Sequence, residues 1–253
     1  MSVRAAHGPE VLVLDFDGVL CDSIEECTLV AHLAYEGLPA RAFAEPGLAG
    51  VPPDVVERFR HYRPFMRHLG HFLVALVDTG PPQDHAAFAA RYARVPTARA
   101  ETFVETATAV RAEVRRDHLA AWLARHRVEA AIAALAAGAY IATARDASSV
   151  LEIGRAHGLR LNHARIFHSL RDKTDALASI ASLESVRRSD VRLVDDSIEN
   201  CLAAKAAGFG AGWATWGYHA PGDAKIARTH RIGALTVDEL KKAWYCAQVF
   251  RLF

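Results

Sequence analysis

Short apolar runs alternate with helical segments in the second half of the chain. The runs AYIATA and DVRLVDD predict buried strands, and segments with helical spacing follow them at Ser148–His157 and Ile198–Ala207. Each of these helices is followed by a glycine, as is the alanine-rich helical segment Ala130–Ala137. Glycine is favoured just beyond a helix C-terminus because it adopts the left-handed conformation there. Strands that alternate with helices indicate a parallel α/β sheet.

The first half of the chain follows a different pattern. The run Val11–Leu14 predicts one buried strand, but residues 22–127 contain no convincing second strand. Their apolar positions follow helical spacing, as in the stripe Phe103, Ala107, Val110 and Val114. We therefore expect an α/β fold: a Rossmann-like parallel-sheet core built discontinuously from residues 1–21 and 128–253, with an all-helical domain inserted at residues 22–127.

Composition and charge narrow the choice of partners. The 253 residues carry a net charge of +1, which gives no reason to expect nucleic acid or an anionic membrane. The four cysteines lack CxxC spacing and are expected to be reduced thiols of a cytoplasmic protein. The longest uncharged apolar stretch, Ala130–Ala144, is too short for a membrane span. The sequence does not predict an oligomeric state.

An acidic pair follows the first predicted strand. Asp15 and Asp17 come directly after the apolar run, and residues two apart on a strand point to the same side. Ligands of open α/β sheets bind beyond the carboxyl ends of the strands. Two neighbouring carboxylates repel unless a cation or a shared proton relieves them. This pair therefore predicts a metal site, a proton-transfer site, or both.

Three further stretches place polar residues beside predicted elements. IATARD has Thr143 at a strand end, RDKTDAL has Lys173 at a helix start, and VRLVDDSIEN has Asp195 and Asp196 at another strand end. With DFDGV, these stretches resemble in order and context the four motifs of the haloacid dehalogenase (HAD) superfamily. The resemblance covers roughly residues 10–23 and 138–215. The insertion resembles a helical C1-type cap only in kind and in its place after the first motif.

The resemblance implies a role for each core residue. Asp15 would be the nucleophile that forms an aspartyl-phosphate. Asp17 would protonate the leaving oxygen and then activate water. Thr143 would hydrogen-bond the phosphoryl oxygens, and Lys173 would neutralise charge on Asp15 and the phosphate. Gly18, at the turn away from the strand end, is expected beside the bound substrate.

The resemblance also implies a Mg²⁺ cofactor. Asp196 and Asp15 would be ligands together with the backbone carbonyl of Asp17, and Asp195 would be a second ligand or support the site from behind. Many family members have GDxxxD where this chain has the sequence DDSIEN. Because of this departure, it stays open whether Asp195, Ser197 or Asn200 completes the metal shell.

Candidate substrate contacts extend beyond the core motifs. Ala144 and Arg145 follow Thr143 directly and are candidate substrate contacts, with a surface position as the alternative for Arg145. The basic stretch Arg58–Phe72 contains Arg63 and Arg67 and no acidic residue. It is either a face that contacts an anionic substrate or an exposed helix surface.

The function implied is a Mg²⁺-dependent phosphomonoesterase that acts on a small phosphorylated metabolite, such as a sugar phosphate. A sugar phosphomutase shares every core motif and stays an alternative, and a non-catalytic binding protein of the same fold is a weaker one. The presence of Asp17 argues against a dehalogenase, since the family's dehalogenases lack this second aspartate. A phosphonatase of this family needs a cap lysine, and residues 22–127 contain none.

Overall fold

The chain divides into two compact units. The computed structural model describes residues 11–45, 47–78 and 80–249, with side chains described up to residue 244. The sheet unit contains the chain up to Cys21, Val128–Tyr218 and the chain from Asp223 onward. The helical unit contains Asp22–Arg127 and His219–Gly222.

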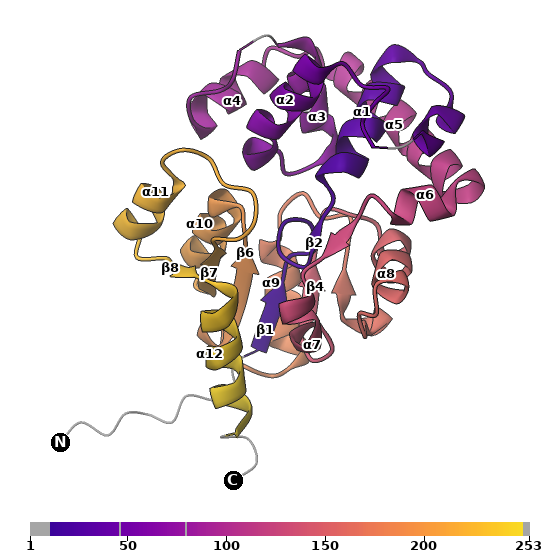
Figure 1. The fold of residues 1–253 in the computed structure, drawn as a ribbon. Coiled ribbons are helices and arrows are strands. Elements are labelled where there is room, and N and C mark those ends of the chain that lie inside the picture. The colour runs from indigo at the N-terminus through magenta and orange to yellow at the C-terminus, as the bar shows by residue number, and fades with distance from the viewer. Residues whose placement is uncertain (1–10, 46, 79, 250–253) are drawn as a thin grey trace, which may run out of the picture. The chain divides into compact units, whose positions relative to one another are not determined.

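A six-stranded parallel sheet forms the centre of the sheet unit (Figure 1). Its order is β5-β4-β1-β6-β7-β8, with bounds Ile166–Phe167, Tyr140–Ala142, Val11–Leu14, Val191–Asp195, Gly210–Ala214 and Gly233–Leu235. The first strand is central and pairs Val13 with Tyr140 on one side and with Leu193 on the other. All four residues of β1 are buried, as a strand covered on both faces requires. The predicted α/β fold with a Rossmann-like parallel sheet is confirmed.

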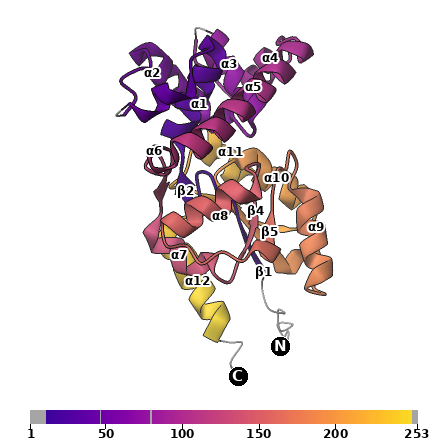
Figure 2. The same ribbon diagram turned by 90° about the vertical axis from the view of Figure 1, so that its right-hand side faces the viewer.

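Helices cover both faces of this sheet. Figure 2 views it close to edge-on, with α12 on one side and α9 and α10 on the other. The helices of the unit are α7 Ala133–Ala136, α8 Ala147–Ala156, α9 Thr174–Leu183, α10 Ile198–Ala206, α11 Asp223–Thr229 and α12 Val237–Val249. The core between the sheet and helices α9 and α10 buries Val13 of β1, Leu193 of β6 and Leu177 of α9. Burial of each such side chain stabilises the fold by roughly 1.5–3 kcal/mol.

The boundaries of these elements follow local sequence signals. Gly158 and Gly208, which follow α8 and α10, have φ angles of +76° and +88°. The alanine-rich segment predicted as one helix is instead a 3₁₀ turn, Ala130–Ile132, followed by the short α7. Strands β5 and β8 were not predicted, because two or three residues give no readable periodicity. Two further 3₁₀ turns lie at His163–Arg165 and Arg188–Asp190.

Among its described residues from Ser23 to His126, the helical unit contains no strand. Its helices are α1 Ile24–Glu36, α2 Pro53–Tyr62, α3 Phe72–Val77, α4 His85–Tyr92, α5 Thr97–Asp117 and α6 Leu119–Leu123. Short 3₁₀ turns lie at Ala40–Ala44, Arg63–Phe65 and Leu69–His71. The chain crosses between the units at β2 Cys21–Asp22 and β3 Arg127–Val128, which pair with each other. Of the predicted α5 stripe, Phe103, Ala107 and Val114 are buried.

A buried carboxylate joins three helices of this unit. Glu26 of α1 accepts hydrogen bonds from Arg111 of α5, at 2.7 and 3.2 Å, and from the indole of Trp122 of α6, at 3.2 Å. The side chains of Glu26 and Trp122 are fully buried. A buried charge with its counter-charge and further donors is the arrangement in which burial is tolerated.

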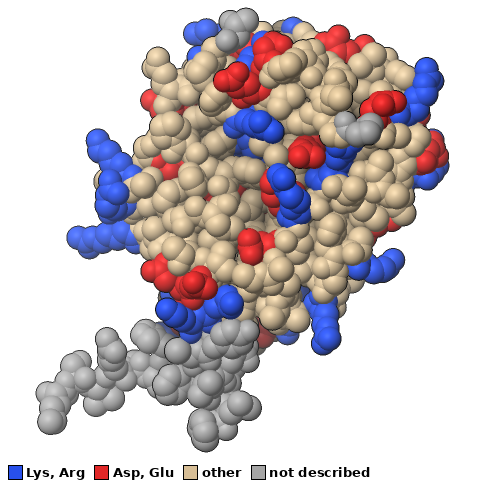
Figure 3. Space-filling view, viewed as in Figure 1, with Lys and Arg blue, Asp and Glu red and all other residues tan. Residues whose placement is uncertain are grey.

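None of the described helices is long and apolar enough to cross a membrane. On the face drawn in Figure 3, basic and acidic side chains are interspersed in small groups.

Candidate functional site

Three neighbouring strands of the sheet unit bring the predicted residues together. Because β4, β1 and β6 are adjacent and parallel, their carboxyl ends meet at one edge of the sheet. Asp15 follows β1, Thr143 follows β4, and Asp195 ends β6. Lys173 is the N-cap residue of α9.

Lys173 links two of the carboxylates. Its ammonium nitrogen lies 2.8 Å from Oδ2 of Asp15 and 2.6 Å from Oδ2 of Asp195. The side chain of Lys173 is only 8% exposed, so the ion pairs are shielded from bulk water. The single lysine between the second and fourth motifs is therefore held directly against the predicted nucleophile.

Three carboxylates converge at this edge, with fewer cationic groups beside them. Carboxylate oxygens of Asp15, Asp195 and Asp196 lie within 4.8 Å of one another, and all three residues are nearly buried. Among the described residues, this is the one cluster of three or more histidine, cysteine or acidic side chains that could hold a metal ion. Hard divalent cations prefer oxygen ligands of this kind. The cluster thus fits a divalent cation in ligand type and in charge.

Electrostatics at Asp15 reflect this crowding. Burial raises the pKa of Asp15 from its ordinary value to about 7, with the negative charges of Asp195 and Asp17 adding to the rise and Lys173 opposing it. Burial by itself would lower the pKa of Lys173, but the carboxylates of Asp15 and Asp195 outweigh burial and raise that pKa. Lys173 is therefore a permanent cation, whereas Asp15 needs more positive charge to stay ionised.

Asp195 is surrounded by donors. Besides Lys173, it accepts hydrogen bonds from the side-chain amide of Asn200, at 3.1 and 3.2 Å, and from the backbone N–H of Ser197, at 2.8 Å. The hydroxyl oxygen of Ser197 accepts a bond from the backbone N–H of Asn200 and caps α10. These contacts supply a structural reason for all three residues that the sequence left open. Asp195 holds Lys173 in place, and Asn200 holds Asp195.

Asp196 lies in a narrow backbone cradle. Its Oδ2 accepts a hydrogen bond of 2.7 Å from the backbone N–H of Tyr218. Gly18 and Gly217 approach it so closely that a Cβ on either residue would overlap the Asp196 side chain. Sequence reasoning missed Gly217 and Tyr218. The signal was available, because they follow β7, whose carboxyl end lies at the same sheet edge as that of β6.

Thr143 is buried at the end of β4. Its hydroxyl oxygen accepts a hydrogen bond from the backbone N–H of Arg145, at 3.1 Å. Its backbone N–H donates to the carbonyl of Phe167, and its backbone carbonyl accepts from the N–H of Leu170. Since the hydroxyl oxygen acts as acceptor toward Arg145, its proton can be donated to an anion.

The second acid of the opening motif contacts the loop after β4. Asp17 forms an ion pair with Arg145 at 3.0 Å. Ala144, which precedes Arg145, is exposed. The structure thus brings Arg145, a predicted substrate contact, directly onto Asp17.

Arg63 and Arg67 belong to the helical unit. The stretch Arg58–Phe72 is not one helix but runs from the end of α2 through two 3₁₀ turns. Arg63 is buried and donates a hydrogen bond of 3.0 Å to the carbonyl oxygen of Met66, whereas Arg67 is exposed. The stretch is therefore a partly exposed helix end, with Arg60 and His61 exposed, followed by turns in which Arg63 is buried. Its contact with a substrate stays a prediction.

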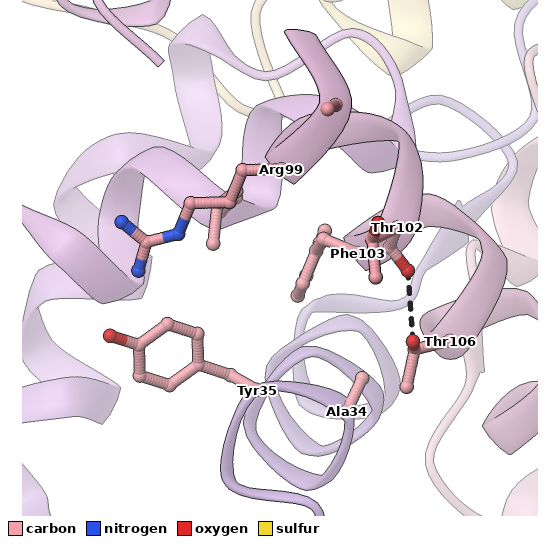
Figure 4. Close-up of a pocket in the computed structure, with 8 residues that line it drawn as sticks. Ala34, Tyr35, Arg99, Thr102, Phe103 and Thr106 are labelled. Carbon is pink, nitrogen blue, oxygen red and sulfur yellow. Dashed lines mark hydrogen bonds between the residues drawn. The ribbon is translucent and has the colours of Figure 1, made fainter. Parts of the chain in front are cut away.

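A pocket of about 420 Å³ lies within the helical unit, lined by Ala34, Tyr35, Leu73, Ala98, Arg99, Thr102, Phe103 and Thr106. Arg99 of α5 and Tyr35 of α1 extend to the same side of it (Figure 4). The Thr106 hydroxyl is engaged with the backbone carbonyl of Thr102 at 2.8 Å. The lining contains no carboxylate, histidine or cysteine, the side chains that most often bind a metal ion.

Comparison with solved structures identifies the fold. A haloacid dehalogenase-like hydrolase from Streptococcus pneumoniae matches with a TM-score of 0.56 at 15% identity, covering 93% of this chain and 97% of that one. A predicted phosphatase from Clostridium acetobutylicum matches with a TM-score of 0.61 at 15% identity, covering 94% and 99%. Protein tyrosine kinase A from Mycobacterium tuberculosis matches with a TM-score of 0.55 at 21% identity, covering 94% and 99%.

No protein-family model and no curated protein matches the chain. The structural matches extend over nearly the whole of this chain and of each neighbour. The protein therefore has the haloacid dehalogenase-like fold that its four motifs predict.

Proposed function

We propose that this protein is a phosphatase that hydrolyses a phosphate monoester of a small metabolite through an aspartyl-phosphate on Asp15. The observation that carries the proposal is the buried contact of Lys173 with Asp15, beside the carboxylate of Asp196. A nucleophilic carboxylate must approach a negatively charged phosphate, so cationic groups at that point are essential to the reaction.

The two half-reactions are assigned to residues as follows. An oxygen of Asp15 attacks phosphorus while the bond from phosphorus to the ester oxygen breaks, and Asp17 gives a proton to that leaving oxygen. Asp17 then takes a proton from water, whose oxygen attacks phosphorus. The Asp15 carboxylate and inorganic phosphate are released. Thr143 donates its hydroxyl proton to a phosphoryl oxygen, and Lys173 offsets negative charge throughout.

Asp15, Asp196 and the backbone carbonyl of Asp17 would hold a Mg²⁺ ion. Mg²⁺ usually takes one or two carboxylates and keeps water and substrate oxygens for its remaining positions, which suits two carboxylates and one carbonyl. The ion would supply charge stabilisation to the phosphoryl group. We assign Asp195 to the support of Lys173, because its oxygens accept bonds from Lys173, Ser197 and Asn200.

Specificity is assigned to the helical unit, which we propose acts as a C1-type cap. Within this proposal, Arg63 and Arg67 remain candidate contacts to a distal anionic or hydroxylated part of the substrate. Gly18 and Ala144 are candidate contacts near the phosphate.

Turnover assays on the purified chain test the proposal. We expect release of inorganic phosphate from p-nitrophenyl phosphate and from members of a panel of sugar, nucleotide and organic-acid phosphates. EDTA should eliminate this activity and Mg²⁺ should restore it. Ca²⁺ should not, because its larger and looser coordination shell misplaces the reactants.

A pair of lysine variants provides the matched control. K173M should lose turnover, whereas K205M should not, because Lys205 is exposed and donates only to the carbonyl of Arg231 among the described residues. Transfer of the phosphoryl group to a second sugar hydroxyl, with no phosphate released, would favour a phosphomutase. Absence of phosphate release and transfer with every substrate would contradict the proposal.

A further inference from the structure

The Asp17 carboxylate has one guanidinium group fitted across both of its oxygens. Nε of Arg145 lies 3.2 Å from Oδ1 and 3.1 Å from Oδ2, and a terminal nitrogen of Arg145 lies 3.0 Å from Oδ1. The Arg145 side chain is 2% exposed and that of Asp17 is 18% exposed. The arginine is therefore buried behind the carboxylate, which keeps a share of its surface open.

The backbone of Arg145 is fixed on the loop between β4 and α8. Its N–H donates to the hydroxyl oxygen of Thr143, and its carbonyl accepts from the N–H of Ser169. The next residue, Asp146, caps α8 by accepting bonds from the backbone N–H and hydroxyl of Ser149. The guanidinium thus projects from a loop anchored at both ends.

Asp17, whose carboxylate Arg145 contacts, lies on a tight turn. The peptide N–H groups around Asp17 are used in closing this turn: Gly18 donates to the carbonyl of Cys21, and Cys21 donates to that of Phe16. These bonds fix the backbone and do not engage the Asp17 carboxylate. A planar guanidinium that contacts both oxygens fixes the side-chain torsions of Asp17, whereas an ammonium group offers only a point charge.

We infer that Arg145 is a positioning residue for Asp17, which it orients for proton transfer to and from the reacting oxygens. This inference rests on the proposed function and differs from the role expected from the sequence, in which Arg145 contacts the substrate. Misplacement of a group involved in proton transfer by about 1 Å is enough to slow a reaction strongly.

The inference predicts a dependence on the leaving group. In single-turnover measurements, R145M and R145K should slow phosphorylation of Asp15 by an alkyl phosphate about tenfold or more, because the poor leaving group needs a proton. Both variants should affect p-nitrophenyl phosphate by less than about threefold, since nitrophenolate leaves without one. R145K keeps the charge, so it remains informative if R145M unfolds.

A double-mutant cycle separates positioning from the alternatives. With alkyl phosphate, adding R145K to D17N should slow phosphorylation less than about twofold further, because Arg145 acts through Asp17. The control is R187M: the exposed Arg187 makes a similarly bidentate pair with the largely buried Asp190, just before β6 and not at its Asp195 end, and its loss should leave both substrates unaffected.

Three outcomes decide the matter. If the Arg145 variants lose phosphorylation rate only with the alkyl phosphate, and this loss vanishes in the D17N background, the inference is supported. If the Arg145 variants lose rate equally with both substrates, with a raised KM, and the loss persists in the D17N background, Arg145 contacts the phosphate and the inference is overturned. A wild-type chain that releases no phosphate from either substrate refutes the proposed function itself, whereas the first two outcomes require an active wild type.

Discussion

An added methyl group at Gly18 would disturb the site directly. The φ angle of Gly18 is +88°, in the region that side chains rarely adopt. A Cβ there would overlap the carboxylate of Asp196 and lie 2.9 Å from Cδ2 of Tyr218. The glycine therefore serves both the turn after β1 and the close approach of Asp196.

The variant G18A separates these two effects when it is compared with G158A. Gly158 has a φ of +76° but open space where its Cβ would lie, so both variants carry the backbone strain and only G18A carries the overlap. We expect G158A to lose about 1 kcal/mol of stability and to keep full turnover. G18A should lose turnover and weaken Mg²⁺ binding, measured by isothermal titration calorimetry. Equal turnover in the two variants would show that the close packing of Gly18 on Asp196 is unimportant.

The individual side chains of the site were largely predictable, but their partners were not. Asp15, Thr143, Lys173 and Asp196 each follow from a polar residue at the edge of a predicted element. The contact of Arg145 with Asp17 joins residues 128 positions apart, and no local pattern reports such a pairing. The supporting role of Asp195 likewise emerges only when Lys173 and Asn200 are seen to converge on it.

At the scale of elements, α1, α5 and α6 meet at the buried carboxylate of Glu26. Arg111 and Trp122 reach it from α5 and α6, and Arg111 is only 15% exposed. Removal of one partner from a buried ion pair costs several kcal/mol, because the other charge is left without compensation.

We accordingly expect E26Q to destabilise the helical unit by about 3 kcal/mol. Hydrogen exchange read by mass spectrometry should show faster exchange of α1 and α5 amides, with the sheet unit unchanged. The control D117N breaks the exposed contact of Asp117 with Arg116 and should have no measurable effect, since exposed ion pairs contribute little. Unchanged exchange in E26Q would mean that packing alone holds these helices together.

Element prediction succeeded where a segment was long enough to show a period. The helices α5, α8 and α10 have clear apolar spacing or a flanking glycine. The basic stretch after Arg58 was misread in part, because its charges mask two 3₁₀ turns that depend on tertiary packing. Strand β5 has only two residues and is defined by pairing with β4 rather than by its own sequence.

At the scale of the whole molecule, the sequence reveals a fold interrupted by an insertion. The regular alternation of strands and helices after residue 128 completes a sheet whose central strand lies before residue 22. The inclusion of His219–Gly222 in the helical unit was not predicted, since the short segment lacks any periodic signal. The sequence does not identify the substrate either, because the helical unit, to which we assign specificity, resembles a cap only in kind.

The proposed mechanism depends on phosphorylation of Asp15 during turnover. The most direct measurement is mass spectrometry of protein quenched in acid during reaction with an excess of p-nitrophenyl phosphate. We expect one added phosphoryl group on the peptide that contains Asp15, present in wild type and in D17N and absent in D15N. Two results would contradict phosphorylation of Asp15. One is turnover by the wild type with no phosphoryl group on that peptide. The other is turnover by D15N within about tenfold of wild type, because loss of a catalytic nucleophile should cost much more.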